Sequence, residues 1–394
     1  GLYNSPAPGI NPTSFVLLVG DVAQIPTYNG TSGSHVTDLY YAEYTGNLIP
    51  EVFIGRFSAT NTTQLQPQID KTLEYEQYLF PTEAYLGEAT MVAGADAGYI
   101  THSNGQINYG TNNYFNAAHG ILSHTYLQPE PSGANYSANI ISNVSNGVGY
   151  GNYTAHCGTS GWADPSFEIS DIAGLQNASK YPLLVGNCCL SNSFQTTCFG
   201  EELLRAANKG AVGYIGASNN SYWDEDYWWG VGFKTVALNP PYTAAHLGAY
   251  DVTFHDHGEA STSWFVTQGQ MVVGGNMAVE ESNSTRKTYY WEIYNLMGDP
   301  SLMVYFGIPQ AVTANYVNTL LVGMTSLTVN TEQNALVALS MNGVQLATAM
   351  AGATGVVNLT FPAISNVGTA YLVITKQNRK PHIGSLTVVP ASGP

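Results

Sequence analysis

Two apolar runs of the sequence end in residues that could serve as a nucleophile and its base. One run ends at His156, and another ends at Cys188 and Cys189. A thiol attacks a peptide carbonyl well only as the thiolate, which a neighbouring imidazole can generate by taking the proton. Backbone N–H groups at Cys189 and near Gly158 could stabilise the oxyanion that forms. Together these residues indicate acyl transfer by a cysteine nucleophile.

The segments that must position these residues alternate between strand-like and helix-like patterns. Short runs rich in Val, Ile, Leu and Tyr predict buried strands, and they lie at 14–21, 89–96, 147–156, 181–187 and 210–218. Helical patterns lie at 63–80, 109–120 and 199–210. This alternation predicts an α/β domain built on a parallel sheet. Functional groups gather beyond the carboxyl ends of such strands, so Asp96, His156 and the cysteine pair could form one site.

The periodicity changes after Gly307. Short alternating runs predict the strands of a small β-sandwich, and they lie at 325–331, 335–343, 355–361 and 369–376. We therefore expect two domains, 1–307 and 308–394. The first strand candidate begins at Ser14 with no helix before it, so we also expect the first domain to lack an N-terminal segment.

The composition excludes several classes of partner. Only 11 Lys and Arg stand against 27 Asp and Glu, a formal net charge of -16, which leaves no phosphate-neutralising surface for nucleic acid or an anionic membrane. No apolar stretch approaches the roughly 20 residues of a membrane-spanning helix. Charged residues make up only 10%, and a polar but uncharged surface is more usual outside cells, so we expect a secreted or cell-surface protein.

Taken singly, these signals also have structural explanations. A cysteine after an apolar run is most often a small buried residue, and a histidine at a strand end is usually only hydrogen bonded. All four cysteines lie close together in the sequence, which favours local chemistry over a disulfide framework. A zinc site is a weaker alternative, because its ligands would lack two separated C-x-x-C pairs. Its candidate ligands are His156, Cys157, Cys188, Cys189 and Cys198.

The motifs around these residues resemble those of the gingipains, secreted cysteine peptidases with a caspase-like catalytic domain. The resemblance is carried by "VTDLYYAEYTGNLIPEVFIGRFSA", "VAGAD", "NYTAH" with "WADP", "LVGNCC", "CFGEEL", "GAVGYIGASNNSYWDEDYWW" and "YYWEIYNLMGDPS". It covers most of residues 13–305 and is nearest to the lysine-specific members. It implies a parallel sheet with helices on both faces, followed by an immunoglobulin-like β-sandwich.

The resemblance also implies roles for individual residues. The second cysteine of "GNCC", Cys189, matches the nucleophile, and the histidine of "YTAH", His156, matches the general base. The aspartate of "AGAD", Asp96, matches the acid that orients the imidazole and stabilises its cation. Cys188 is then a structural neighbour of the nucleophile.

A second set of matched residues implies substrate specificity. Asp226 in "SYWDED" matches the aspartate that gives the lysine-specific members their preference, with Thr154, Tyr222 and Trp223 lining the pocket. A buried carboxylate there would pair with a substrate ammonium. An acidic floor attracts arginine as well, so arginine specificity is an open alternative. From composition alone, the segment would be a surface loop with aromatic packing.

One departure from the family pattern concerns the residue after His156. The gingipains have glycine there, whereas this chain has Cys157 followed by Gly158. We hypothesise that Cys157 caps the active thiol as a disulfide with Cys189, which would be a reversible redox lock.

The resemblance further implies structural calcium and synthesis as an inactive precursor. Loops around Asp38 and Glu51 offer acidic and carbonyl groups that suit a hard cation, although no spacing identifies ligands. No cofactor is expected in catalysis. The expected partners are protein or peptide substrates and the chain's own cleaved N-terminal segment, held as a second chain.

We therefore predict a secreted cysteine endopeptidase that cleaves after lysine. Cys189 attacks, His156 moves the proton and Asp96 orients the imidazole, while Asp226 selects the substrate. The alternative is an extracellular structural or adhesive protein that reuses the fold. The loss of a catalytic residue would favour that alternative, and none is lost.

Overall fold

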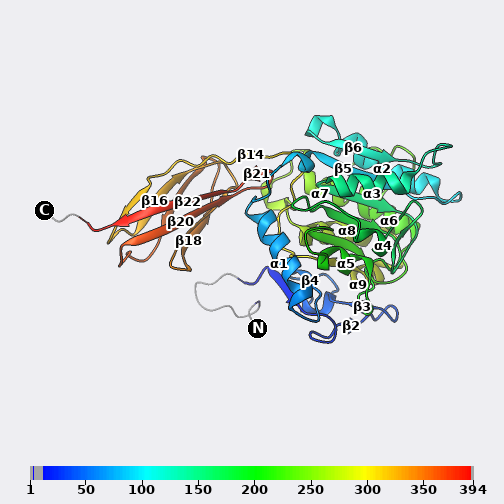
Figure 1. Cartoon of the computed structure of the whole chain (residues 1–394), viewed down its shortest axis with the longest axis horizontal. Coiled ribbons are helices and arrows are strands. Elements are labelled where there is room, and N and C mark those ends of the chain that lie inside the picture. The colour runs from blue at the N-terminus through cyan, green and yellow to red at the C-terminus, as the bar shows by residue number, and fades with distance from the viewer. Residues whose placement is uncertain (1–2, 4–11, 392–394) are drawn as a thin grey trace. The chain divides into compact units, whose positions relative to one another are not determined.

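The computed structural model of this chain describes Tyr3 and residues 12–391 (Figure 1). The chain divides into two compact units, Gly1–Ile308 and Pro309–Pro394, which we call the first and the second unit. Each unit has hydrophobic core residues of its own. In the part of the chain that the structure describes, no helix is long and apolar enough to cross a bilayer.

An eight-stranded sheet forms the centre of the first unit. Its strands are β1 Phe15–Val19, β4 Phe53–Phe57, β5 Glu88–Ala93, β6 Leu122–Tyr126, β7 Tyr150–Thr154, β11 Leu183–Asn187, β12 Gly213–Ala217 and β13 Tyr294–Met297. They lie in the order β1-β4-β13-β12-β11-β7-β5-β6. The five predicted strand runs are confirmed as β1, β5, β7, β11 and β12. Short strands lie in the connections: β2 Tyr28–Asn29, β3 Val36–Thr37, β8 Cys157–Gly158, β9 Gly161–Ala163 and β10 Ser166–Glu168.

The sheet is mostly parallel, as predicted, with one exception at β13. This strand runs antiparallel to β12 and parallel to β4. All four of its residues are buried, as are all five residues of β7, β11 and β12. A continuous apolar run indicates that a strand is buried on both faces, but it carries no information on strand direction. The orientation of β13 therefore could not be read from the sequence.

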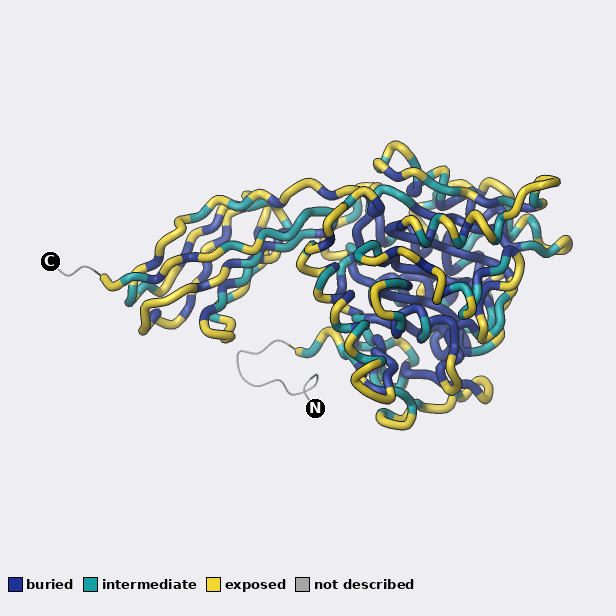
Figure 2. The backbone as a smooth tube through the Cα atoms, in the orientation of Figure 1, coloured by how far each residue is buried: buried dark blue, intermediate teal, exposed yellow. Residues whose placement is uncertain are grey.

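Helices cover both faces of the sheet, as the family resemblance implied. Successive residues of a strand point to opposite faces, so Met91 of β5 belongs to one core and Val92 to the other. The first core is closed by α2 Ile100–Asn113, α6 Trp223–Val231, α7 Ala249–Phe254, α8 Gln268–Glu281 and α9 Lys287–Ile293. The second is closed by α3 Tyr136–Asn146, α4 Ile169–Ile172 and α5 Phe199–Arg205. The central strands are the most continuously buried part of the tube in Figure 2.

The predicted helices agree with the structure in two cases and are displaced in the third. Helices α1, Thr62–Glu76, and α5 begin close to the predicted positions but end earlier. Helix α2 begins at Ile100, nine residues before the predicted segment 109–120. Its first turns carry Ser, Asn and Gly, which are weak helix formers, so propensity conceals them. Gly120, with φ 70, closes the short 3-10 turn Ala117–His119 and not the α-helix.

The second unit is a β-sandwich, in agreement with the prediction. Its strands are β14 Gln310–Ala311, β15 Thr319–Leu321, β16 Ser326–Asn330, β17 Leu336–Met341, β18 Val344–Met350, β19 Val356–Thr360, β20 Gly368–Thr375, β21 Arg379–Lys380 and β22 His382–Val389. The five-stranded sheet β15-β22-β20-β17-β18 and the pair β16-β19 contribute to one core. Buried and exposed residues alternate along β16 and β19, because each sheet has one inner face.

Candidate active site

Three adjacent parallel strands bring the predicted nucleophile, base and acid to one edge of the sheet. Strand β7 lies between β11 and β5, and its last residue, Thr154, pairs in register with Asn187 of β11 and Ala93 of β5. The three strands therefore end at the same level. The segments that follow them carry His156, the pair Cys188 and Cys189, and Asp96, respectively.

His156 and Asp96 form a direct contact. The imidazole Nε2 lies 2.8 Å from Asp96 Oδ2, and the histidine side chain is about half exposed, at 53%. This hydrogen bond, together with one from the N–H of Gly98, lowers the pKa of Asp96, so that carboxyl is an anion at neutral pH. Because Nε2 faces the carboxylate, Nδ1 is the ring nitrogen left to accept a proton.

Cys189 is a half-buried free thiol held against the segment that follows β12. The N–H of Ser221 donates a hydrogen bond to Cys189 Sγ, with N and S 3.3 Å apart, and Sγ lies 3.8 Å from the Ser221 carbonyl oxygen. Burial raises the pKa of the Cys189 thiol, and the Ser221 N–H opposes this only in part. Among the described residues, Sγ makes no hydrogen bond with His156. The thiol is therefore protonated at neutral pH and requires a base to become a nucleophile.

An aromatic stack joins the histidine to the start of α6. Trp223, the first residue of α6, meets the His156 ring edge-on, with centroids 5.3 Å apart, and also stacks in parallel on Tyr99 at 4.8 Å. The imidazole thus packs against one of the predicted pocket residues. This contact orients the ring without using either of its nitrogens.

The cysteines pair differently from the hypothesis of a redox lock. Cys157 forms a disulfide with Cys188, and Cys189 and Cys198 are free. The proposed bond between Cys157 and Cys189 is therefore wrong, and the bond found also removes two of the candidate zinc ligands. Cys188 is fully buried whereas Cys189 is partly exposed, so the two neighbouring side chains point into different surroundings, and Cys188 is the one that reaches Cys157. The disulfide instead ties the residue after His156 to the residue before Cys189.

We expect this disulfide to stabilise the first unit substantially. It closes a loop with a sequence separation of 31, for which the loss of chain entropy in the unfolded state predicts about 3–4 kcal/mol. The double variant Cys157→Ala, Cys188→Ala should lose about that much free energy of unfolding in a urea titration. Reductant should destabilise the wild type but not the variant. An unchanged unfolding midpoint in the variant would contradict the assignment.

Asp226, the predicted pocket carboxylate, is buried and contacts Ser221, the residue that also contacts the thiol. It is only 4% exposed, and three hydroxyl groups donate to it: Ser221 Oγ at 2.5 Å, Tyr290 Oη at 2.9 Å and Tyr294 Oη at 2.6 Å. Burial raises the pKa of Asp226 to about 7, against the effect of these hydrogen bonds, which lower it. Ser221 thus contacts both Cys189 and Asp226.

The other predicted pocket residues surround this region to different degrees. Thr154 is buried at the end of β7. Tyr222 is exposed, and its ring lies 3.8 Å below the guanidinium of Arg286, which also pairs with Glu225 at 3.2 Å. The Tyr222 backbone N–H donates to Tyr290 Oη. The tyrosine main chain is therefore fixed to α9, whereas its side chain remains at the surface.

The buried position of Asp226 predicts a pH-dependent stability. Its pKa of about 7 lies above the ordinary aspartate value near 4, so the folded state binds a proton that the unfolded state releases. Stability is therefore lost as the pH rises from about 4 to about 7. Asp226→Asn should gain up to about 4 kcal/mol relative to the wild type over this interval. Urea unfolding of both proteins at about pH 5 and about pH 8 tests this, and a pH-independent difference would contradict it.

Three residues of this arrangement were missed by the sequence analysis: Ser221, Tyr290 and Tyr294. All three lie inside motifs that carry the family resemblance. No local signal could have found the tyrosines together, because Tyr290 lies on α9 and Tyr294 is the first residue of β13. Nothing in the sequence indicates that they meet Asp226, more than sixty residues earlier in the chain.

The loops expected to hold calcium use their carboxylates for protein contacts. Both oxygens of Asp38 accept from Arg56, each at 2.7 Å. Glu51 accepts from the Tyr44 N–H and the Thr45 hydroxyl, each at 2.6 Å. In the described ranges, no group of three or more His, Cys, Asp or Glu side chains could hold a metal. These two residues therefore do not fit a calcium site.

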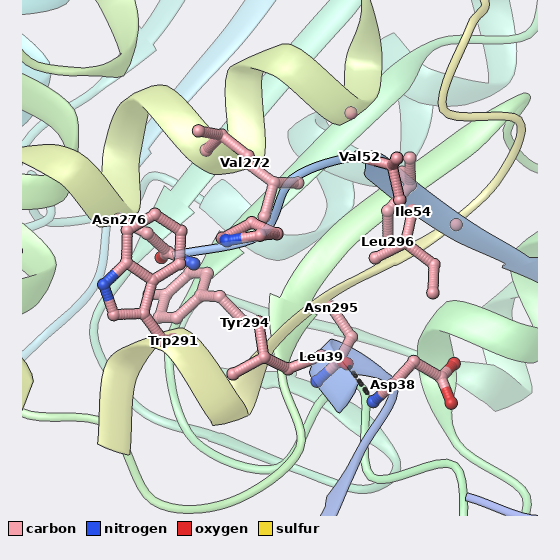
Figure 3. A pocket seen from close by; sticks show the side chains of 14 residues that line it. Asp38, Leu39, Val52, Ile54, Val272, Asn276, Trp291, Tyr294, Asn295 and Leu296 are labelled. Carbon is pink, nitrogen blue, oxygen red and sulfur yellow. Dashed lines mark hydrogen bonds between the residues drawn. The ribbon is translucent and has the colours of Figure 1, made fainter. Parts of the chain in front are cut away.

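A cavity of about 30 Å³ lies between β4, β13, α8 and α9 (Figure 3). Its lining is largely apolar, with Val52, Ile54, Val272 and Leu296 among the residues that face it. This volume has room for about one or two water molecules and not for a peptide side chain. None of the predicted catalytic or pocket residues lines it, so it is not the substrate site.

The sequence as a whole matches a known peptidase family. The family described as Peptidase family C25 matches residues 2–305. Lys-gingipain HG66 of Porphyromonas gingivalis is 36% identical over 396 residues, which cover 97% of this chain and 22% of that protein. The chain thus spans about a fifth of the length of this curated relative.

Solved structures show the same relationship. One described as a protease matches with a TM-score of 0.90 and 34% identity, covering 98% of this chain and 86% of the other. The crystal structure of the Arg specific cysteine proteinase gingipain R matches with a TM-score of 0.81 and 23% identity, covering 98% and 87%. At that identity it shows a shared fold alone. From the family match and this fold, the chain belongs to peptidase family C25, the gingipain family.

Proposed function

We propose that this chain is a cysteine endopeptidase that cleaves peptide bonds after lysine. One observation carries the proposal: Ser221 joins a free thiol, Cys189, to a buried carboxylate, Asp226, beside the His156–Asp96 pair. The thiol supplies a nucleophile and the histidine a base. The carboxylate supplies a counter-charge for a cationic side chain at a fixed distance from the thiol.

In the proposed mechanism, His156 Nδ1 takes the proton of the Cys189 thiol as the sulfur attacks the carbonyl carbon of the substrate lysine. The C=O bond becomes a C–O⁻ bond, and backbone N–H groups beside Cys189 and beside His156 stabilise the oxyanion. The imidazolium that forms is stabilised by the ionised Asp96. Since the Cys189 thiol is protonated beforehand, this proton transfer is part of the chemical step.

Collapse of the tetrahedral intermediate breaks the C–N bond and leaves a thioester on Cys189. His156 returns its proton to the leaving amine and then takes one from a water molecule, whose oxygen attacks the thioester. The C–S bond then breaks, and the imidazolium returns its proton to the sulfur, which leaves a new carboxylate on the lysine and the regenerated thiol. No cofactor takes part in these steps.

The acceptor positions of Asp226 favour lysine over arginine. A carboxylate has about four lone-pair positions, and Oδ1 already accepts from Tyr290 and Tyr294 while Oδ2 accepts from Ser221. The position that remains suits the compact ammonium of lysine. A guanidinium binds a carboxylate best through two parallel hydrogen bonds, which would displace one of these hydroxyls.

Family membership supports further parts of the proposal. We propose that residues 1–307 are the catalytic domain and that residues 308–394 form an immunoglobulin-like domain. We also propose a secreted or cell-surface enzyme, made as a precursor whose N-terminal segment remains bound after cleavage. Structural calcium stays a prediction from the resemblance, with no ligand assigned.

The test uses fluorogenic peptides that differ only in the residue before the scissile bond: lysine, arginine or norleucine, which has the length of lysine without its charge. We expect kcat/KM to be highest for lysine, with at least about a tenfold margin over arginine because of the lost bidentate geometry. An arginine preference would establish the alternative specificity. Cleavage of none of the three would favour the structural or adhesive protein.

A further inference from the structure

Three hydroxyl groups surround the carboxylate that the proposed function assigns to the pocket floor. We infer that Ser221, Tyr290 and Tyr294 are specificity-determining residues, which form a hydroxyl cage that holds Asp226 as an anion ready for a substrate ammonium. The inference rests on the proposed function. It assigns the strength and pH range of the lysine preference to residues other than the carboxylate itself.

The cage is built from three separate parts of the chain. Ser221 belongs to the segment between β12 and α6, Tyr290 to α9, and Tyr294 to β13. Two of the hydroxyls are themselves oriented, because Asn187 Nδ2 donates to Tyr294 Oη at 3.1 Å and the Tyr222 N–H donates to Tyr290 Oη at 2.7 Å. Donors that are fixed in advance stabilise a charge without a cost of reorganisation.

The two tyrosines contribute unequally. Tyr294 directs its only hydroxyl proton at Asp226 Oδ1, at 2.6 Å. Tyr290 has two acceptors for its proton, Asp226 Oδ1 at 2.9 Å and the Tyr222 carbonyl at 3.0 Å. Tyr294 is therefore the stronger donor. Its removal should have the larger effect.

Among the described residues, no lysine or arginine forms an ion pair with Asp226. The other titratable groups that face it are Cys189 and Glu225, together with Tyr289 of α9. Glu225 is an adjacent acid on α6, and its charge is matched by Arg286 at 3.2 Å. A buried anion that is bonded only to hydroxyl groups can still pair with a cation from outside the protein, which here is the substrate side chain.

Burial and hydrogen bonding have opposite effects on the pKa of Asp226, and together they make lysine binding pH-dependent. Burial favours the protonated carboxyl, the cage favours the anion, and the resulting pKa is about 7. Below that pH the free enzyme loses the charge that attracts lysine. Loss of a cage hydroxyl raises the pKa further, because one of the hydrogen bonds that lower it is gone.

The experiment measures kcat/KM for the lysine and norleucine peptides from about pH 5.5 to about pH 9, and takes their ratio. Any ionisation that affects the cleavage of both peptides equally cancels in the ratio, so the ratio reports the charge of the pocket. The wild-type ratio should rise with a midpoint near pH 7. In Tyr294→Phe the midpoint should move up by about one pH unit, with a smaller shift in Tyr290→Phe and full recovery at high pH.

A matched control is available in the same unit. Asp251 is another buried aspartate that accepts from tyrosine hydroxyls, Tyr109 Oη at 2.6 Å and Tyr114 Oη. Tyr109→Phe removes an equivalent hydroxyl away from the pocket and should leave the ratio and its midpoint unchanged. Hydrolysis of the norleucine peptide, normalised to the amount of Cys189 that can be alkylated, shows that each variant is folded.

The possible outcomes separate the inference from the function it rests on. If Tyr294→Phe and Tyr290→Phe kept the lysine preference and the wild-type midpoint, the proposed role of the hydroxyl cage would be wrong. A lysine preference that survives Asp226→Asn would overturn the pocket assignment of the proposed function. A fall in lysine and norleucine cleavage together, with no recovery at high pH, would make the tyrosines merely structural and would also overturn the cage.

Discussion

Replacement of Cys189 by alanine is expected to lower kcat on the lysine peptide by on the order of 10⁵-fold. The thiol is the atom that forms the covalent bond, and no other described cysteine can replace it. Cys157 and Cys188 are joined in a disulfide, and Cys198 is buried. His156→Ala should cost a similar factor, because the burial that raises the pKa of Cys189 leaves the thiol dependent on a base. The measurement is single-turnover cleavage at matched protein concentration.

The matched control for this variant is Cys198→Ala. Cys198 is the other free cysteine of the first unit, it lies at the start of α5, and it has no contact with the proposed site. Its removal should change stability slightly and kcat within about twofold. If Cys189→Ala retained activity, Cys189 would not be the nucleophile. If the wild type itself were inactive, the result would favour the alternative that the chain is a structural or adhesive protein.

Asp226→Asn is expected to reduce kcat/KM for the lysine peptide by about 10²- to 10³-fold and to leave the norleucine peptide nearly unchanged. The substrate ammonium would enter a buried site and lose its only opposite charge, whereas an uncharged side chain would lose little. The ratio of the two peptides should also become independent of pH. Steady-state kinetics at about pH 8, where the wild-type carboxylate is ionised, gives the largest contrast.

The control for this experiment lies two residues away on the same helix. Asp224 is exposed and pairs with His102 at 2.9 Å. Asp224→Asn removes the same charge from α6 without touching the pocket, so only a small, salt-dependent change is expected. An equal loss in both variants would mean that the general negative potential of the protein attracts lysine, and that no specific pocket exists.

Local sequence patterns predicted much of the fold. Four of the five apolar runs became strands buried between two layers of helices, whereas β1 lies at the edge of the sheet and is mostly not buried. Helix boundaries were less predictable. Helix α2 begins at Ile100 through residues of low propensity, since burial of positions such as Ile107 outweighs their preference for turns. Tertiary contacts, which the local sequence does not contain, decide such cases.

The candidate site was also predicted only in part from the sequence. The strand-end rule alone indicated that Asp96, His156 and the cysteine pair could meet, because adjacent parallel strands end together. The partner of Cys157 could not be read from spacing, since Cys188 and Cys189 are neighbours in sequence and differ in burial, which the sequence does not show. That choice depends on which loop lies across the sheet edge.

The sequence by itself determined the family, the alternation of strands and helices, and the polar residues that follow the strands, since these are properties of local composition and order. The tertiary structure alone decided the direction of β13, the Cys157–Cys188 bond and the hydroxyl cage of Asp226. Each of these depends on a contact between segments far apart in the chain. The burial that brings Tyr290 and Tyr294 to Asp226 also gives that carboxylate its unusual pKa, and neither property belongs to any short stretch of sequence.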